Sequence, residues 1–310
     1  MDAIVIGAGV AGLRCARELQ AAGCSVRVLE KSRGVGGRCA TRRVEGQPVD
    51  HGVPFLHGDD STFRAEIEAA AGDGLVDGWP HRVVGTGRPC DRRALRPGHW
   101  RCAIRQGVND LAKRLADGLD VRRGVRVATI RAGHDRFVAR DVGGEEHVAR
   151  SLVIALPAPQ AAGLLRTVDD PDRGTRTAIE LLDSSAMEPC VTVLAEYDVD
   201  LPAPAFDLWL PDDGTVVQTI VHDSAKRDRP DRIVLVVQAF AAWSSSHLSG
   251  PPEVSARAML EEVGRIVDRR LATPRARQVH RWRYARSLGA SQLAAPMLLR
   301  PRDTGMMALT

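Results

Sequence analysis

The chain has 310 residues, which is enough to bury a large core and is typical of about two domains. Hydrophobic residues make up 44% of it, and no low-complexity tract occurs, so the composition indicates a globular protein. The net charge of +4 comes from basic residues that are interleaved with acidic ones along the whole length. A nucleic-acid surface, which would need clustered cations, is therefore not expected.

Targeting segments and metal sites are not expected either. No stretch approaches the ~20 apolar residues of a membrane span, because Pro157 and Pro159 interrupt the longest candidate, 151–165. An expected strand begins at residue 3 and leaves no room for a secretory leader, so we expect a cytoplasmic protein. The six cysteines show no CxxC spacing and the histidines form no HxxxH pair, which favours reduced thiols and no metal.

The first motif is a glycine turn between two expected strands. Residues 3–6 (AIVI) predict a strand, residues 11–22 a helix that ends at Gly23, and residues 25–30 a second strand. The turn between them reads GAGVAG and fits the G-x-G-x-x-G pattern of a dinucleotide-binding βαβ unit. A bare glycine pattern is weak, but here the strand, the helix and the following acid agree with it.

Each glycine of this turn has a physical role. Gly7 permits the tight turn, Gly9 lets the backbone approach a pyrophosphate, and Gly12 lets the helix pack closely on the sheet. The N–H groups and the positive dipole end of the helix then point at the phosphates. Gly7, Gly9, Val10, Ala11 and Gly12 are therefore included in the predicted cofactor site.

The end of the second expected strand carries an acid. Glu30 lies 18 residues after Gly12, where a carboxylate can accept hydrogen bonds from both ribose hydroxyls of an adenosine. An acid also repels a 2′-phosphate, which argues against NADP at this site. Lys31, the next residue, is included in the predicted cofactor site.

A second glycine pair follows, at Gly36-Gly37-Arg38. An NAD-binding unit has no need for it, whereas in a flavoprotein this loop folds back and brings backbone and Arg38 to the other side of the pyrophosphate. Together with the first turn and Glu30, it resembles the FAD-binding N-terminus of the amine-oxidase and renalase superfamily. The resemblance implies FAD as the cofactor.

The resemblance continues along almost the whole chain, from residue 3 to about 286. Renalase-like bacterial proteins are similar at residues 39–43 (CATRR), 50–52 (DHG), 223–226 (DSAK) and 280–285 (HRWRYA). After the DHG turn the family commonly has Ala-Gln-Tyr near the flavin ring, where this chain has Val53-Pro54-Phe55. The resemblance also implies that the backbone of Val127 meets the adenine base.

Further elements follow in chain order. Residues 60–71 predict an amphipathic helix, and residues 75–105 predict short antiparallel strands. The other expected strands are 121–130, 136–142, 147–156 (joined to the preceding strand by a hairpin at 143–144), 191–197, 216–221, 233–240 and 278–285, with a helix at 254–271.

The predicted fold class is α/β, with a Rossmann-type FAD-binding domain and an inserted substrate domain that has a mixed or antiparallel sheet, as in amine oxidases. The FAD-binding domain takes in residues 1–75, 100–170 and 287–310, and the substrate domain residues 76–99 and 171–286.

Residues for catalysis are not identified by any motif, because the flavin itself carries the redox chemistry. Trp243, Trp282 and Tyr284 are weak candidates for positioning the substrate; Trp282 and Tyr284 lie two apart on one expected strand and face the same side. Lys226 begins a charged stretch that reads most simply as a solvated turn.

The last residues, 304–310 (TGMMALT), predict a strand. In the family such a strand runs into a Gly-Asp pair and a helix that hold the ribityl chain and the flavin N1 edge. The printed sequence ends where that pair is expected.

We therefore predict an FAD-dependent oxidoreductase resembling bacterial renalase. It would oxidise a small dihydronicotinamide or amine-like substrate by hydride transfer to flavin, with O2 as the acceptor. A catalytically impaired or non-catalytic nucleotide-binding remnant is the second hypothesis, because the flavin closure is missing. An NAD-linked dehydrogenase is the third, disfavoured because residues 36–38 have no role there.

Overall fold

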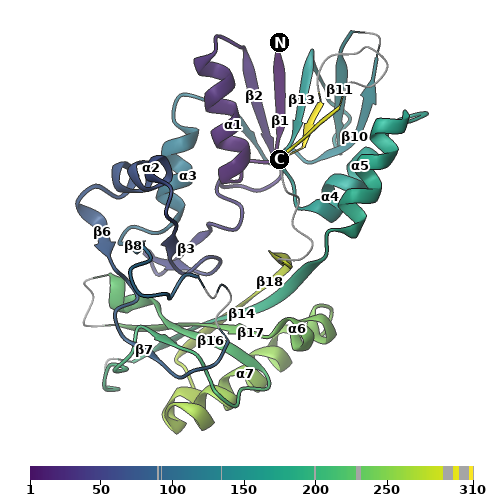
Figure 1. Ribbon diagram of the computed structural model, residues 1–310. Coiled ribbons are helices and arrows are strands. Elements are labelled where there is room, and N and C mark those ends of the chain that lie inside the picture. The colour runs from purple at the N-terminus through teal and green to yellow at the C-terminus, as the bar shows by residue number, and fades with distance from the viewer. Residues whose placement is uncertain are drawn as a thin grey trace. The chain divides into compact units, whose positions relative to one another are not determined.

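The computed structural model of the chain describes residues 1–88, 91, 93–133, 135–198, 200–227, 232–288, 296–299 and 307–309 (Figure 1). The chain forms two compact units. Unit 1 consists of Met1–Cys39, Ala112–Met187 and Arg286–Thr310, and unit 2 of Ala40–Leu111 and Glu188–Ala285. Among the described residues, no helix is both long enough and apolar enough to cross a bilayer.

Unit 1 contains a largely parallel sheet, a small antiparallel sheet and several helices. Its elements are β1 (Ala3–Ile6), α1 (Val10–Ala21), β2 (Val26–Glu30), α3 (Asn109–Ala116, cut by the division), β9 (Asp120–Arg123), β10 (Val127–Ala132), β11 (Phe137–Asp141), β12 (Glu146–Ala149), β13 (Ser151–Ile154), α4 (Ala158–Leu165), α5 (Arg173–Ser184), β19 (Met297–Leu299) and β20 (Met307–Leu309).

The main sheet of unit 1 has the order β19-β20-β13-β1-β2-β9. All neighbours in it are parallel except β19 and β20, and Val5 of β1 pairs with Val28 on one side and Val153 on the other. Helix α1 lies along β1 and β2 (Figure 1). This βαβ arrangement confirms the Rossmann-type part of the predicted α/β fold.

The core of unit 1 explains why these strands are apolar throughout. Ile4, Leu29 and Leu152 are buried, and they belong to one cluster with side chains of α4, α5, β10 and β11. A central parallel strand is covered on both faces, so near-continuous apolar runs are required. The strands β13, β1 and β2, which carry these apolar side chains, thus form the middle of the sheet.

Two of the predicted strands are wrong in extent. The expected strand 121–130 is two strands, β9 and β10, because Gly124 between them has φ +76° and turns the chain. The expected strand 147–156 is also two, β12 and β13, in different sheets. The hairpin predicted at 143–144 is confirmed and joins β11 to β12.

The C-terminal strand predicted at 304–310 is confirmed for the part that the structure describes. Residues 307–309 form β20, which pairs in parallel with β13. Residues 304–306 and 310 lie outside the described residues.

Unit 2 is built around a mixed sheet. Its elements are β3 (Thr41–Val44), β4 (Gln47–Asp50), β5 (Leu56–His57), α2 (Ser61–Ala71), η1 (Gly72–Gly74), β6 (Leu75–Asp77), β7 (Val83–Val84), β8 (Arg101–Ile104), β14 (Met187–Tyr197), β15 (Leu208–Trp209), β16 (Val217–His222), η2 (Asp223–Lys226), β17 (Ile233–Ala239), α6 (Ala241–His247), α7 (Pro252–Ile266), η3 (Arg269–Ala272) and β18 (Ala276–Ser287).

The large sheet of unit 2 has the order β18-β14-β17-β16-β15-β7. In it, β14, β17, β16 and β15 pair antiparallel and β7 pairs in parallel with β15. One face packs on the apolar side of α7, which includes Ala256, Met259 and Val263 (Figure 1). The other face packs on residues from the hairpin β3–β4 and the segment after it, such as Val49 and Phe55. The predicted strands of this region are confirmed to within a few residues, whereas the predicted helix 254–271 is two elements, α7 and the 3-10 helix η3.

The two compact units divide the chain at other residues than the predicted domains. Residues 40–75 and 100–111 fall in unit 2, whereas they were predicted with the first 39 residues. The physical reason is that β4 contacts β17 and η2, so the hairpin β3–β4 belongs to the core of the large sheet.

Candidate functional site

The first glycine turn leaves β1 with the geometry that the sequence predicts. Gly7 has φ +108°, a conformation that side chains rarely adopt, and its N–H donates to the carbonyl of Leu29 (2.9 Å). A Cβ on Gly12 would lie 2.1 Å from the Gly7 oxygen and 2.9 Å from Cβ of Ala155. The close packing of helix on sheet predicted for Gly12 is therefore confirmed.

Gly9 is different, because the space in front of it is empty. It is the N-cap of α1, in extended conformation, and a Cβ there would meet no atom within 4 Å. In the part of the chain that the structure describes, no side-chain hydrogen bond caps α1 at Gly9. The N–H groups of that turn, which lack intrahelical acceptors, thus face open space where an anion can bind.

The second glycine loop lies against the first. Gly36 forms a parallel β-bridge with Gly9 and donates its N–H to the Ala8 carbonyl (2.8 Å). A Cβ on Gly37 would lie 3.4 Å from Cα of Gly9. The two loops that the sequence separates by more than twenty residues therefore form one backbone surface. Arg38, the next residue, is exposed.

Glu30 is held at the end of β2 with only 8% of its surface exposed. One carboxylate oxygen accepts the N–H of Ala8 (2.8 Å) and the other accepts the N–H of Ser32 (2.7 Å). Each oxygen has a further lone pair, so both can still accept a hydroxyl. The backbone bonds fix the carboxylate in place before any ligand arrives.

A cavity of about 390 Å³ opens beside Glu30, entirely within unit 1. Its polar lining residues are Glu30, Lys31, Arg126 and Gln160, and the others are apolar or glycine. Its lining residues are Ile6, Gly7, Leu29, Glu30, Lys31, Val125, Arg126, Val127, Ala128, Val142, Leu156, Gln160, Gly163 and Leu164. Four predicted cofactor residues are among them, namely Gly7, Glu30, Lys31 and Val127. The other predicted residues belong to the two glycine loops.

Sequence reasoning missed the far wall of this cavity. Val142 comes from the β11–β12 hairpin, and Gln160 and Gly163 come from α4. A Cβ on Gly163 would meet no atom within 4 Å, so it too borders open space. None of the motifs described in the sequence includes Val142, Gln160 or Gly163, so no local signal identified them.

These residues fit the ADP part of FAD. An apolar slot lined by Val127, Val142 and Leu164 suits an adenine ring, and Glu30 suits the ribose diol. The open space at Gly9 and the uncapped start of α1 suit a pyrophosphate. The hydrogen-bonding groups, the open space at Gly9 and the cavity all suit an adenosine diphosphate group.

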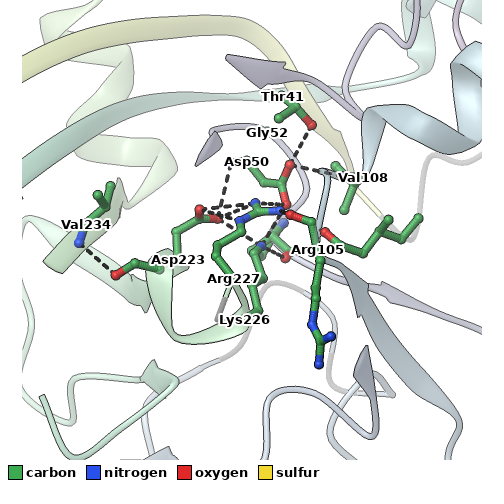
Figure 2. A network of polar contacts seen from close by, with 12 residues as sticks. Thr41, Asp50, Gly52, Arg105, Val108, Asp223, Lys226, Arg227 and Val234 are labelled. Carbon is green, nitrogen blue, oxygen red and sulfur yellow. Dashed lines mark hydrogen bonds and ion pairs between the residues drawn. The ribbon is translucent and has the colours of Figure 1, made fainter. Parts of the chain in front are cut away.

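Unit 2 contains a buried network of charges (Figure 2). Asp50 and Asp223 are fully buried, and Lys226 is 2% exposed. The Lys226 ammonium lies 2.8 Å from Asp50, 2.9 Å from Asp223 and 2.6 Å from the Pro54 carbonyl. The prediction of a solvated turn at Lys226 is therefore wrong, because each of its three donors has a buried acceptor.

Arg227 completes the network. Its guanidinium donates to Asp50 (2.6 Å), to both oxygens of Asp223 and to the carbonyls of Ile104 and Arg105. Two carboxylates and two cations make the cluster neutral. Burial alone would raise the pKa of the Asp50 carboxyl, but the charges of Lys226 and Arg227 hold it below its usual range.

The remaining acceptor sites of Asp50 join further segments to the network (Figure 2). Thr41 donates its hydroxyl to Asp50 (2.6 Å), and the backbone N–H of Val108 donates to the same oxygen (3.0 Å). The segments 41–54, 104–108 and 223–227 are thus tied at one point. The two carboxylates come from the segments DHG (50–52) and DSAK (223–226), which resemble the renalase family. That resemblance was the one indication in the sequence that these residues are important.

Next to Asp50 lies a cluster of rings. His51 is 6% exposed, stacks on Trp282 (ring centres 5.4 Å apart) and meets His280 edge-on (4.9 Å). Trp282 donates its indole N–H to the His51 carbonyl (3.0 Å). Among the described residues, Nδ1 of His51 has no hydrogen-bond partner although it is buried. No role for His51 beyond its turn was expected.

Both imidazoles of this cluster are neutral at pH 7. Burial, reinforced by His280 and Arg42, lowers the pKa of His51 to about 4. Burial and the charge of Arg42 lower the pKa of His280 to about 4. A neutral imidazole whose Nε2 carries the proton leaves Nδ1 free to accept a hydrogen bond. Nδ1 of His51 therefore keeps an unused acceptor site that carries no charge.

The three predicted substrate-positioning residues have different surroundings. Trp282 belongs to the ring cluster and Tyr284 lies two residues further along β18, half-buried. Trp243 is in α6, where it packs on the core beneath α7 and stacks on His247 (ring centres 3.8 Å apart). The structure thus brings Trp282, but not Trp243, against His51.

Two family models match this chain. One, described as a flavin containing amine oxidoreductase, matches residues 90–302, and the other, described as an NAD(P)-binding Rossmann-like domain, matches residues 5–65.

Curated relatives of this chain match over short stretches. Pseudooxynicotine dehydrogenase of a Pseudomonas species is 43% identical over 66 residues, 21% of this chain and 13% of that protein. Putrescine oxidase of Kocuria rosea is 40% identical over 67 residues, 22% of this chain and 14% of that protein. The matched segment thus spans about one seventh of the length of these relatives.

Solved structures match over nearly the whole chain at low identity. A putrescine oxidase bound to putrescine has a TM-score of 0.68 at 15% identity and covers 90% of this chain and 84% of its own. Cyclohexylamine oxidase from Brevibacterium oxydans IH-35A has a TM-score of 0.72 at 14% identity and covers 100% and 92%. These likenesses show the fold.

Proposed function

The chain belongs to the family of flavin-containing amine oxidoreductases, and we propose that it binds FAD and oxidises a small amine or dihydronicotinamide by hydride transfer, with O2 as the final acceptor. The cavity beside Glu30, taken together with the open space at Gly9 and the β-bridge between Gly9 and Gly36, is the observation that carries the proposal. It has the chemistry of an adenosine site with an adjacent anion site.

The residues of unit 1 account for the cofactor and its selectivity. Glu30 accepts the ribose hydroxyls and repels a 2′-phosphate, so FAD or NAD is favoured over NADP. The side chains of Val127 and Val142 border the adenine slot. A second backbone segment, formed by Gly36, Gly37 and Arg38, lies beside Gly9. A pyrophosphate that is bound from two sides requires such a segment, whereas a plain NAD site does not.

When bound, the flavin supplies the two-electron acceptor of the reaction. The protein must bind the substrate in its uncharged form and orient the carbon that loses hydride. We assign the substrate side to unit 2, with Trp282 and the neutral pair His51 and His280. An unpartnered imidazole nitrogen accepts an N–H of the neutral substrate, and the absence of cationic rings avoids repelling an amine.

The test begins with the absorption spectrum and flavin content of the purified chain, before and after incubation with FAD. A flavin spectrum with about one FAD per chain supports the proposal, and a chain that neither carries nor takes up flavin overturns it. Turnover is then measured as hydrogen peroxide formed from a panel of primary amines, polyamines and dihydronicotinamides. Reduction of NAD by a flavin-free chain would favour an NAD-linked dehydrogenase instead.

The panel also separates the two substrate classes. Bleaching of the flavin by an amine under anaerobic conditions identifies an amine oxidase. Bleaching by a dihydronicotinamide alone identifies the renalase-like activity. A flavin that no member of the panel reduces contradicts the proposed activity while leaving the cofactor assignment intact.

A further inference from the structure

The β11–β12 hairpin of unit 1 carries three potential metal ligands, which we call the hairpin cluster: Asp141, Glu145 and His147. Asp141 ends β11, Glu145 follows the Gly143-Gly144 turn, and His147 lies in β12 opposite Ala139. One donor atom from each of the three lies within 4.8 Å of the others. The hairpin fold, with Gly144 at φ +89°, is what brings them together.

His147 gives the second, independent sign of a ligand. It is 5% exposed, and among the described residues its Nε2 has no hydrogen-bond partner. Nε2 points at Oδ2 of Asp141 from 3.6 Å, which is too long for a hydrogen bond. A buried polar nitrogen without a partner is costly, so the arrangement favours a species between the two atoms.

The spacing suits an ion. Two ligands that each lie about 2.0–2.2 Å from a tetrahedral Zn²⁺ are about 3.4 Å apart, close to the observed 3.6 Å. Oδ1 of Asp141 accepts the N–H of Glu145 (3.0 Å), which fixes the carboxylate with Oδ2 toward His147. The Glu145 side chain is 72% exposed and its Oε1 lies 3.9 Å from Nδ1 of His147, so it has to turn toward Nε2 to join an ion there.

From this geometry we infer that the hairpin cluster is a binding site for a divalent transition metal of the zinc type. One imidazole and two carboxylates form the ligand set, and water completes it. Imidazole in the set favours Zn²⁺, Ni²⁺ or Co²⁺ over Mg²⁺ and Ca²⁺, which prefer oxygen ligands alone. The ion neutralises both carboxylates and gives Nε2 of His147 its missing partner.

The ion would brace one wall of the nucleotide cavity. Val142, which follows Asp141, lines that cavity, and its N–H donates to the carbonyl of Arg126, another lining residue. An ion that links Asp141 to His147 ties the two strands of the hairpin on either side of Val142. The site is separate from the donors assigned to FAD, so its test does not depend on flavin chemistry.

Zinc chloride alone, titrated into the full chain and followed by calorimetry, is the test. We expect one saturable site per chain and a rise in thermal midpoint with Zn²⁺, with little response to Mg²⁺. Titration with Co²⁺ checks the ligands, because a site of nitrogen and oxygen donors gives no thiolate charge-transfer band. Absence of saturable binding, or a thiolate band, overturns the inference.

Three variants locate the site. His147→Gln and Asp141→Asn are expected to weaken Zn²⁺ binding at least tenfold. Glu145→Gln, at an exposed position that cannot unfold the hairpin, is expected to weaken it several-fold. Glu146→Gln is the matched control, because Glu146 pairs with Arg131 (2.6 Å) outside the cluster. Equal affinity in Glu145→Gln and His147→Gln and in the unaltered chain contradicts the assignment.

Discussion

Nζ of Lys226 lies 2.8 Å from Oδ2 of Asp50, and both side chains are withdrawn from solvent. The ammonium also sits 4.8 Å from the centre of the Trp79 ring. Both ions are therefore held by partners on several elements of unit 2 rather than by water. The pair is compensated by Asp223 and Arg227, so removal of any one member leaves a buried charge uncompensated.

Substitution Lys226→Met tests that compensation. We expect it to lower the free energy of unfolding by about 3–5 kcal/mol, because two buried carboxylates would then share one guanidinium. The measurement is urea unfolding followed by far-UV circular dichroism. Lys113→Met, on an exposed face of α3, is the control and is expected to change stability by less than about 0.5 kcal/mol.

The double variant Asp50→Asn with Lys226→Met gives a further check. It restores a neutral cluster, so its cost is expected to be smaller than the sum of the two single costs. Additive costs would show that the two side chains do not interact energetically.

The two glycines of the first turn are expected to respond differently to alanine. A methyl group on Gly12 would overlap the Gly7 carbonyl, so Gly12→Ala is expected to destabilise the fold by about 1–3 kcal/mol. A methyl group on Gly9 projects into open space, so Gly9→Ala is expected to change stability by less than about 1 kcal/mol.

The affinity for FAD is expected to depend on Gly9. Gly9→Ala places its methyl group where a pyrophosphate is proposed, and FAD affinity is expected to fall at least tenfold, or about 1.4 kcal/mol. Flavin titration by fluorescence measures it, and Gly34→Ala, which also meets no atom, is the control. Unchanged affinity in Gly9→Ala would place the pyrophosphate elsewhere.

Stability is expected to fall as pH is lowered from about 6.5 to about 4. His51 has an unfolded pKa near 6.5 and a folded pKa of about 4, so in this range the unfolded chain binds more protons. Its contribution amounts to about 3 kcal/mol at most. Asp50, whose pKa is lowered, acts only at lower pH, since its stabilisation is lost below its unfolded value of 3.8.

His51→Gln is expected to flatten this dependence while the other buried histidines keep part of it. The measurement is the unfolding free energy in urea at several pH values between 4 and 7. A slope identical to that of the unaltered chain would show that His51 is protonated equally in both states.

Of the two tryptophans that the sequence offered as candidates for substrate positioning, only Trp282 is expected to affect turnover strongly. Trp282→Phe keeps the ring but removes the donor to the His51 carbonyl, so kcat/KM is expected to fall about tenfold with flavin content unchanged. Trp243→Phe, in the packed helix α6, is expected to change kcat/KM less than about twofold. Equal effects of both variants would argue against a role for the His51 cluster.

The local parts of this protein were predictable from its sequence. The strand at 3–6, the glycine turn, the helix and Glu30 follow from patterns within thirty residues, because such a βαβ unit is set by spacing and backbone sterics. The hairpin at 143–144 was predictable for the same reason. The sequence also predicted that the loop with the glycine pair 36–37 folds back toward the first turn, but it did not predict the β-bridge between Gly36 and Gly9.

Only the tertiary structure decided what distant segments do together. Lys226 has the sequence of a solvated turn, yet it is buried because Asp50 and Asp223 supply acceptors on both sides. The ring cluster of His51 and Trp282 depends in the same way on a strand more than two hundred residues away. Burial of a charge or an imidazole depends on partners from elsewhere in the chain, and the spacing of residues along the sequence does not identify those partners.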